Sequence, residues 1–170
     1  DYILFSSLVQ GQVIHNVFTT NFDDLLNEAL VNYYNNRSRV YAHNEMARYI
    51  SPVSKRPNII KLHGDYLYEN IKNTNLETGD LEANMKTKFS EILNQMNLVV
   101  VGYGGSDHSV MSVLEMVKKD TKFCLIWCGI DPEKLNWRVV QLLNTTKNSF
   151  FVPVSDFQTL VFKLLHRAKQ

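Results

Sequence analysis

The chain has 170 residues, of which 45% are hydrophobic and 21% are charged, and its formal net charge is +1. This length predicts one globular domain over residues 1–170, large enough to bury a core. The near-neutral charge argues against an extended basic surface for nucleic acid. The sequence has neither an apolar run long enough to cross a membrane nor a secretory signal, so we expect a cytoplasmic protein that does not bind membranes.

The first half of the chain alternates between strand and helix patterns. An amphipathic segment at residues 2–9 comes first, and an apolar run at 17–20 then predicts a strand. Apolar residues at helical spacing follow it, namely Leu25, Leu26, Ala29, Leu30 and Tyr33. A weak strand candidate at 39–43 and a stronger one at 58–62 come next. Residues 66–86, rich in Asn, Glu, Lys and Thr, interrupt this pattern and predict an exposed excursion.

The second half continues the alternation. Strands are predicted at 98–102, 123–128 and 150–154, and helical stripes lie between and after them. One of these helices is expected to begin at Asp131, because a capping Asp followed by Pro132 and Glu133 is typical of a helix start. Continuous apolar runs are typical of strands buried on both faces. The sequence therefore predicts an α/β fold, a Rossmann-like parallel sheet with helices on both faces.

The two cysteines, Cys124 and Cys128, lie four residues apart within one predicted strand. This spacing does not suit a disulfide within a strand. Because there is no second cysteine pair, a structural zinc ribbon is not expected either. We predict buried free thiols and no metal site.

Polar residues follow three of the predicted strands, where open parallel sheets bind their ligands. Thr20, Asn21 and Asp23 follow the first strand, and His63 with Gly64 follow the strand at 58–62. The third segment, after residue 101, carries Gly102, Tyr103, Gly104, Ser106 and Asp107. Each segment also has a structural interpretation: a helix cap, a structural histidine and a plain tight turn, respectively.

Taken together, the segments TTNFDDLL, KLHGD and VVVGYGGSD resemble those of the sirtuin-like (silent information regulator-like) domain family, in particular its zinc-free bacterial branch. Members of this branch include NAD-depleting effectors of antiphage defence. Members of the family begin with a strand and a GAG-type glycine loop that holds the cofactor pyrophosphate. No such segment occurs here, so we expect the chain to be part of a longer protein, and to be inactive by itself.

The resemblance implies an NAD glycohydrolase that needs no metal and cleaves the nicotinamide–ribose bond of NAD. Asn21 would position the attacking water and His63 would act as the base, whereas Asp23 would hold the nicotinamide amide. Binding of NAD would also involve Thr20, Gly64 and the third segment, with Gly102, Ser106 and Asp107 on the adenosine side. This hypothesis requires Asn21 and His63 to share one crevice at the carboxyl edge of the sheet.

Two other functions remain open from the sequence. One is a non-catalytic sensor or assembly domain that binds NAD or another nucleotide, and the other is an NAD-dependent protein deacylase. The lack of zinc-ribbon cysteines counts against the deacylase. The resemblance further implies a homo-oligomer and additional domains elsewhere in a longer chain.

Overall fold

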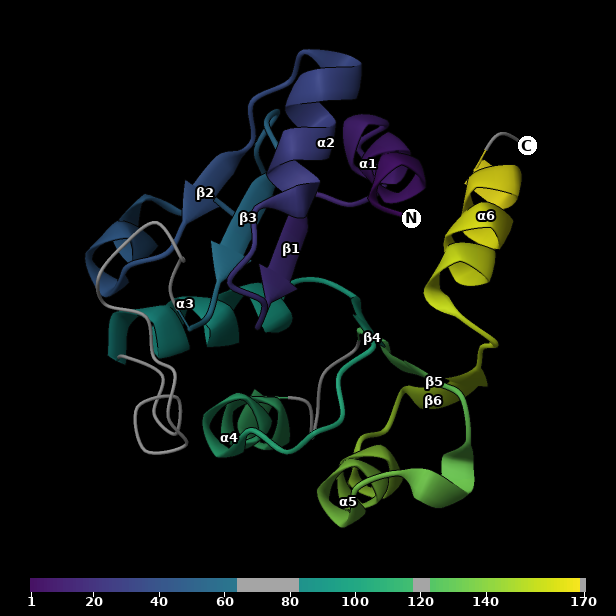
Figure 1. Ribbon diagram of the computed structural model, residues 1–170. Coiled ribbons are helices and arrows are strands. Elements are labelled where there is room, and N and C mark those ends of the chain that lie inside the picture. Colours follow the sequence, from purple (N-terminus) through teal and green to yellow (C-terminus); the bar gives the residue numbers. More distant parts are fainter. Residues whose placement is uncertain (64–82, 118–122, 169–170) are drawn as a thin grey trace. The chain divides into compact units, whose positions relative to one another are not determined.

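The computed structural model describes residues 1–63, 83–117 and 123–168, which form two compact units (Figure 1). The first unit comprises Asp1–Asn73 and Gln158–Gln170, and the second comprises Thr74–Phe157. Each unit contains a sheet of three strands, and every strand pair in both sheets is parallel. The predicted parallel α/β architecture is confirmed, with its strands divided between two sheets. That the two units form one domain stays a prediction.

The first unit is built on a sheet of strand order β1-β3-β2. Its elements in chain order are α1 (Tyr2–Gln10), β1 (Asn16–Thr19), α2 (Leu25–Tyr34), β2 (Arg39–Tyr41), the 3-10 helix η1 (Asn44–Tyr49) and β3 (Asn58–Lys61). The unit also contains nearly all of α6 (Phe157–Ala168). The weak strand candidate at 39–43 is thus a real strand, whereas η1 was not predicted.

A row of apolar side chains across this sheet packs against α1 and α2. The register aligns Val17 of β1 and Val40 of β2 with Ile59 of the central strand. These three contact Val9 of α1 and Leu30 of α2 in one apolar cluster. Because α1 and α2 lie side by side over this face, their packing fixes where α2 begins relative to the carboxyl end of β1 (Figure 1).

The second unit contains a sheet of strand order β4-β5-β6. Its elements are α3 (Ala83–Leu93), β4 (Leu98–Val101), α4 (His108–Val117), β5 (Leu125–Gly129), the 3-10 helix η2 (Pro132–Lys134), α5 (Trp137–Thr145) and β6 (Ser149–Pro153). Trp127 of the central strand is 1% exposed, but Val99 and Phe150 on the two edge strands are about half exposed. Burial on both faces was therefore predicted correctly for the central strand and wrongly for these edge positions.

The expected helix start at Asp131 is wrong. Asp131 accepts a hydrogen bond from the Glu133 N–H at 3.0 Å, but it caps only η2. Leu135 then adopts extended backbone, and α5 begins at Trp137 after a second cap, in which Asn136 accepts from the Arg138 N–H at 2.9 Å. Two capping signals five residues apart compete here, and the later one begins the α-helix.

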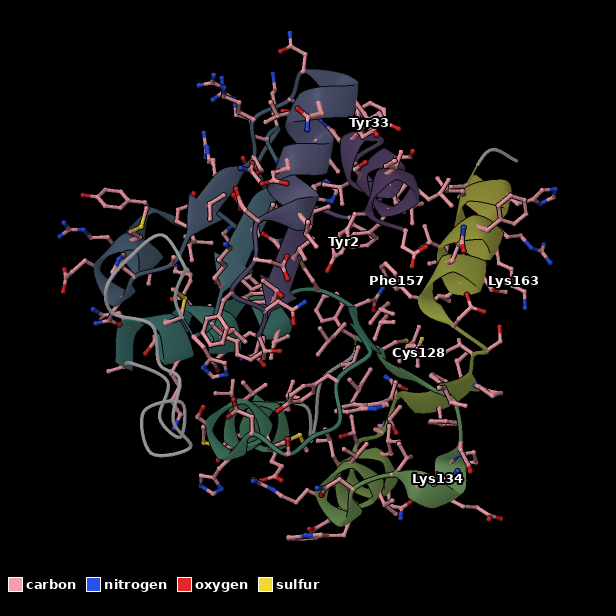
Figure 2. The ribbon with its side chains drawn as sticks, in the orientation of Figure 1. Tyr2, Tyr33, Cys128, Lys134, Phe157 and Lys163 are labelled. Atoms are coloured by element: carbon pink, nitrogen blue, oxygen red, sulfur yellow. The ribbon has the colours of Figure 1, made fainter. Side chains whose placement is uncertain are left out.

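Most of the predicted excursion at 66–86 lies outside the described residues, but its last four residues belong to α3, where Met85 is buried. Both cysteines are free thiols, as predicted. Cys128, labelled on β5 in Figure 2, is buried, and burial raises the pKa of its thiol. Cys124 is only partly buried, which corrects the prediction for that residue. None of the helices that the structure describes is long and apolar enough to span a bilayer.

Candidate functional site

The two predicted catalytic residues follow neighbouring strands at the same edge of one sheet. The parallel register aligns Thr19 of β1 with Lys61 of β3, and the Leu62 N–H donates to the Thr19 carbonyl at 2.9 Å. Asn21 and His63 each come two residues after an aligned position. Strand pairing therefore brings both residues to the carboxyl edge of one sheet, and that they share one crevice there stays a prediction.

The turn between β1 and α2 is ordered by its own side chains. The Asn21 N–H donates to Thr19 Oγ1 at 3.0 Å, and the Leu25 N–H donates to Asp23 Oδ1 at 3.2 Å. The N-cap of α2 is Asp24, which makes no side-chain cap bond, and Asp23 just before it accepts from the first N–H of the helix instead, so it supports the helix start much as the structural interpretation expected. Asn21 and Asp23 are both exposed, and Thr20 is partly buried. The exposed amide and carboxylate remain accessible to a small molecule.

A buried lysine that the sequence analysis missed lies beneath this turn. Lys61, the last residue of β3, is 1% exposed, and its Nζ donates to the Phe22 carbonyl at 3.0 Å. The same ammonium lies 3.5 Å from Asp24 Oδ1. Lysine is seldom fully buried unless it is paired. The signal in the sequence was a lysine directly after the two isoleucines of β3, together with the two carboxylates that follow β1.

His63 is buried, with 6% of its surface exposed. An imidazole that follows a strand at this edge of the sheet can act as a general base, because one of its ring nitrogens can accept a proton. Gly64, predicted to accompany it, lies outside the described residues. The position of His63 thus suits the predicted role, which stays a prediction.

The glycine-rich turn after β4 belongs to the second unit. Gly102 and Gly105 have positive φ angles of 67° and 75°, a conformation that favours glycine. A Cβ on Gly105 would lie 2.3 Å from a methyl group of Val139 in α5, whereas one on Gly102 or Gly104 would meet nothing within 4 Å. Gly105 is therefore explained by packing, and the backbone at Gly102 and Gly104 is open to close approach.

Asp107 caps the helix that follows this turn. Its Oδ1 accepts from the Ser109 N–H at 2.9 Å, the Ser109 hydroxyl at 2.8 Å and the Val110 N–H at 3.2 Å. Ser106 is exposed beside it. The structure thus gives Asp107 a capping role, and its predicted contact with a ligand stays a prediction.

Tyr103 is held by packing and by a hydrogen bond to the same segment. Its ring centroid lies 5.9 Å from that of Trp127, and its hydroxyl donates to the Asp107 carbonyl at 3.3 Å. Burial, and to a lesser degree the negative charge of Asp107, raises the pKa of the Tyr103 phenol. The phenol therefore remains protonated at neutral pH and acts as a donor, not as a base.

An ion pair joins α4 to α5 next to the glycine-rich turn. Arg138 binds both carboxylate oxygens of Glu115, with two N–O distances of 2.9 Å. Its Nη1 also lies 3.0 Å from Nδ1 of His108, the first residue of α4. Because Glu115 already neutralises this guanidinium, the arginine is better suited to holding the two helices together than to binding an anion.

A pocket in the first unit lies at the opposite edge of the sheet. His15, Lys55 and Pro57, which precede β1 and β3, contribute to its lining. In parallel sheets, ligands bind where strands end, not where they begin. We therefore place the candidate site at Asn21 and His63. Among the described residues, no group of three or more His, Cys, Asp or Glu side chains could hold a metal ion.

The geometry defines a parallel α/β protein with polar residues after the strands of its sheets. A family model for the SIR2-like domain matches residues 15–128, which is more than half of the chain and includes all three predicted segments. The chain therefore belongs to the SIR2-like family. Domains of this family use NAD, and its members are NAD-dependent enzymes in general. A search of curated proteins found no match to the chain.

Proposed function

We propose that this domain is an NAD glycohydrolase, which converts NAD and water to nicotinamide and ADP-ribose. The observation that carries the proposal is the pairing of β1 with β3, which brings Asn21 and His63 to one edge of a sheet in a SIR2-like domain. An amide that orients water beside an imidazole that accepts a proton is suited to hydrolysis at a sugar carbon.

In the proposed reaction, the bond between the anomeric ribose carbon and the nicotinamide nitrogen breaks. Its electron pair goes to that nitrogen, which neutralises the pyridinium and releases nicotinamide. The oxygen of a water oriented by Asn21 forms the new bond to the ribose carbon. His63, as the base, takes the proton that this water loses, either directly or through a ribose hydroxyl. Asn21 suits this role because its backbone is fixed by Thr19 while its side chain is exposed.

The other predicted contacts with NAD are proposed for each unit by itself. Asp23 has one oxygen bonded to the Leu25 N–H, and its carboxylate is exposed, so its second oxygen can accept from the nicotinamide carboxamide. Thr20 and Gly64 would lie nearby along the chain. In the second unit, the resemblance implies contacts of the glycine-rich turn with adenosine, with close approach at Gly102 and Gly104 and polar contacts from Tyr103, Ser106 and Asp107.

The proposal extends to a biological role as the NAD-depleting effector of an antiphage defence protein, cytoplasmic, homo-oligomeric and linked to further domains. Its support is the resemblance of the three segments to the zinc-free branch. The cysteine count agrees, because the two cysteines of these 170 residues cannot form a zinc ribbon with four cysteine ligands.

The deciding experiment incubates the complete natural protein with NAD and measures nicotinamide release by chromatography. Asn21→Ala should lower the rate about 100-fold, because a misplaced reactant loses that much. His63→Ala should lower it about 100- to 10,000-fold, the usual contribution of a general base. Asn32→Ala, at an exposed asparagine in α2, is the matched control and should hydrolyse NAD like wild type.

Three outcomes would contradict the proposal. Full turnover in well-folded Asn21→Ala or His63→Ala would remove these residues from the mechanism. Binding of NAD by the wild-type protein without nicotinamide release would favour a sensor. Release that depends on an acetylated lysine peptide, with transfer of the acetyl group to ADP-ribose, would favour a deacylase.

A further inference from the structure

The buried ammonium of Lys61 is not used by the reaction proposed above. Its side chain is 1% exposed, whereas the partner Asp24 is 17% exposed. Removing a charged amine from water is costly unless hydrogen bonds and an opposite charge replace the lost hydration. Both replacements come from the turn between β1 and α2, as the Phe22 carbonyl and the Asp24 carboxylate. The buried ammonium is therefore compensated by a backbone carbonyl and a carboxylate of the same neighbouring turn.

These contacts add a side-chain link between the ends of β1 and β3, beside the hydrogen bonds of the sheet. Lys61 and Phe22 are 39 residues apart in the sequence, and Phe22 lies between Asn21 and Asp23. Among the described residues, the last ladder bond at this edge runs from the Leu62 N–H to the Thr19 carbonyl. After this bond, the Lys61 ammonium holds the carbonyl of Phe22, the residue next to Asn21. Lys61 ends β3, the strand that leads to His63, so it links the two segments.

We infer that Lys61 is a positioning residue, which holds the turn bearing Asn21 and Asp23 in register with His63. This inference rests on the proposed function for its effect on NAD, but the order of the turn can be measured independently. A methionine at position 61 would fill the same space without a donor. The Phe22 carbonyl would then lose a buried partner, and the turn would open more often.

The test uses two variants and one matched control in the complete natural protein. Lys61→Met removes the ammonium and keeps an unbranched apolar stem. Because it leaves the Asp24 carboxylate without its counter-charge, it should also reduce stability. Adding Asp24→Asn removes that charge and keeps an oxygen for the Asn27 side chain, which donates to Asp24 at 2.8 Å. Lys134→Met is the control, because Lys134, labelled in Figure 2, is exposed and pairs with Asp131 at 3.6 Å.

The first readout is amide hydrogen exchange of a peptide that covers residues 19–25. Its amides include those of Asn21 and Leu25, which are bonded to side chains within the turn. Exchange should be about tenfold faster or more in both Lys61 variants and unchanged in Lys134→Met. Wild-type exchange in either Lys61 variant that folds would overturn the inference.

The second readout separates positioning from stability. The double variant should recover part of the melting temperature lost by Lys61→Met, because it no longer contains a partly buried carboxylate without a counter-charge. Its kcat for NAD should nevertheless stay about 10- to 100-fold below wild type, since the Phe22 carbonyl still lacks its donor. Recovery of kcat together with melting temperature would overturn the inference. If the wild-type protein releases no nicotinamide, the proposed function fails, and the exchange comparison still decides whether Lys61 orders the turn.

Discussion

The turns that follow β1 and β4 are held by different interactions. The turn after β1 is held by side chains: Thr19 and Asp23 accept from its backbone, and Lys61 donates to it from a neighbouring strand. The turn after β4 is held by the backbone conformation of Gly102 and Gly105 and by the packing of α5. The first should therefore be sensitive to the loss of a polar partner, and the second to the addition of a methyl group.

The largest effect on stability is expected at Gly105. Gly105→Ala places a Cβ 2.3 Å from a Val139 methyl group at a φ of 75°. Overpacking and left-handed strain together should lower the free energy of unfolding by about 2–4 kcal/mol, measured by urea denaturation. Combining it with Val139→Ala should cost less than the sum of the two single changes, because the clash is removed. Additive losses would show that packing against Val139 does not explain this glycine.

A smaller effect is expected at Asp23 in the other turn. Asp23→Ala removes the acceptor for the Leu25 N–H and should lower the free energy of unfolding by about 1 kcal/mol. Asp23→Asn should be close to wild type in stability, since asparagine caps helices equally well. If the asparagine and alanine variants prove equally destabilised, the negative charge of Asp23 stabilises this turn, and its hydrogen bond with the Leu25 N–H does not.

The smallest effect on stability is expected at Gly104. A substitution there tests whether this glycine is needed for the structure or for ligand binding. Its φ is not positive, and a Cβ there would meet nothing within 4 Å. Gly104→Ala should raise the free energy of unfolding by less than about 1 kcal/mol, because alanine restricts the unfolded chain. Calorimetry should nevertheless show weaker binding of NAD if the nucleotide approaches this backbone, and unchanged affinity would remove Gly104 from the proposed site.

The two turns also differ in how far sequence reasoning could describe them. Apolar runs located the strands to within about two residues, and the polar residues that follow them were recognised from position and motif. The capping role of Asp23 was foreseen as the structural alternative. The role of Gly105 was not, because its reason is a side chain 34 residues away in α5. The sequence also could not decide whether Asp131 or Asn136 caps α5.

By itself, then, the sequence determined the alternation of strands and helices and the residues that leave each strand, because periodicity, caps and turn residues act over a few positions. Only the tertiary structure decided that the strands pair as two sheets, that Asn21 and His63 leave one of them on adjacent strands, and that Lys61 is buried beneath the first turn. These features depend on strand register and on contacts between residues about 40 positions apart, and such contacts leave no local pattern in a single sequence.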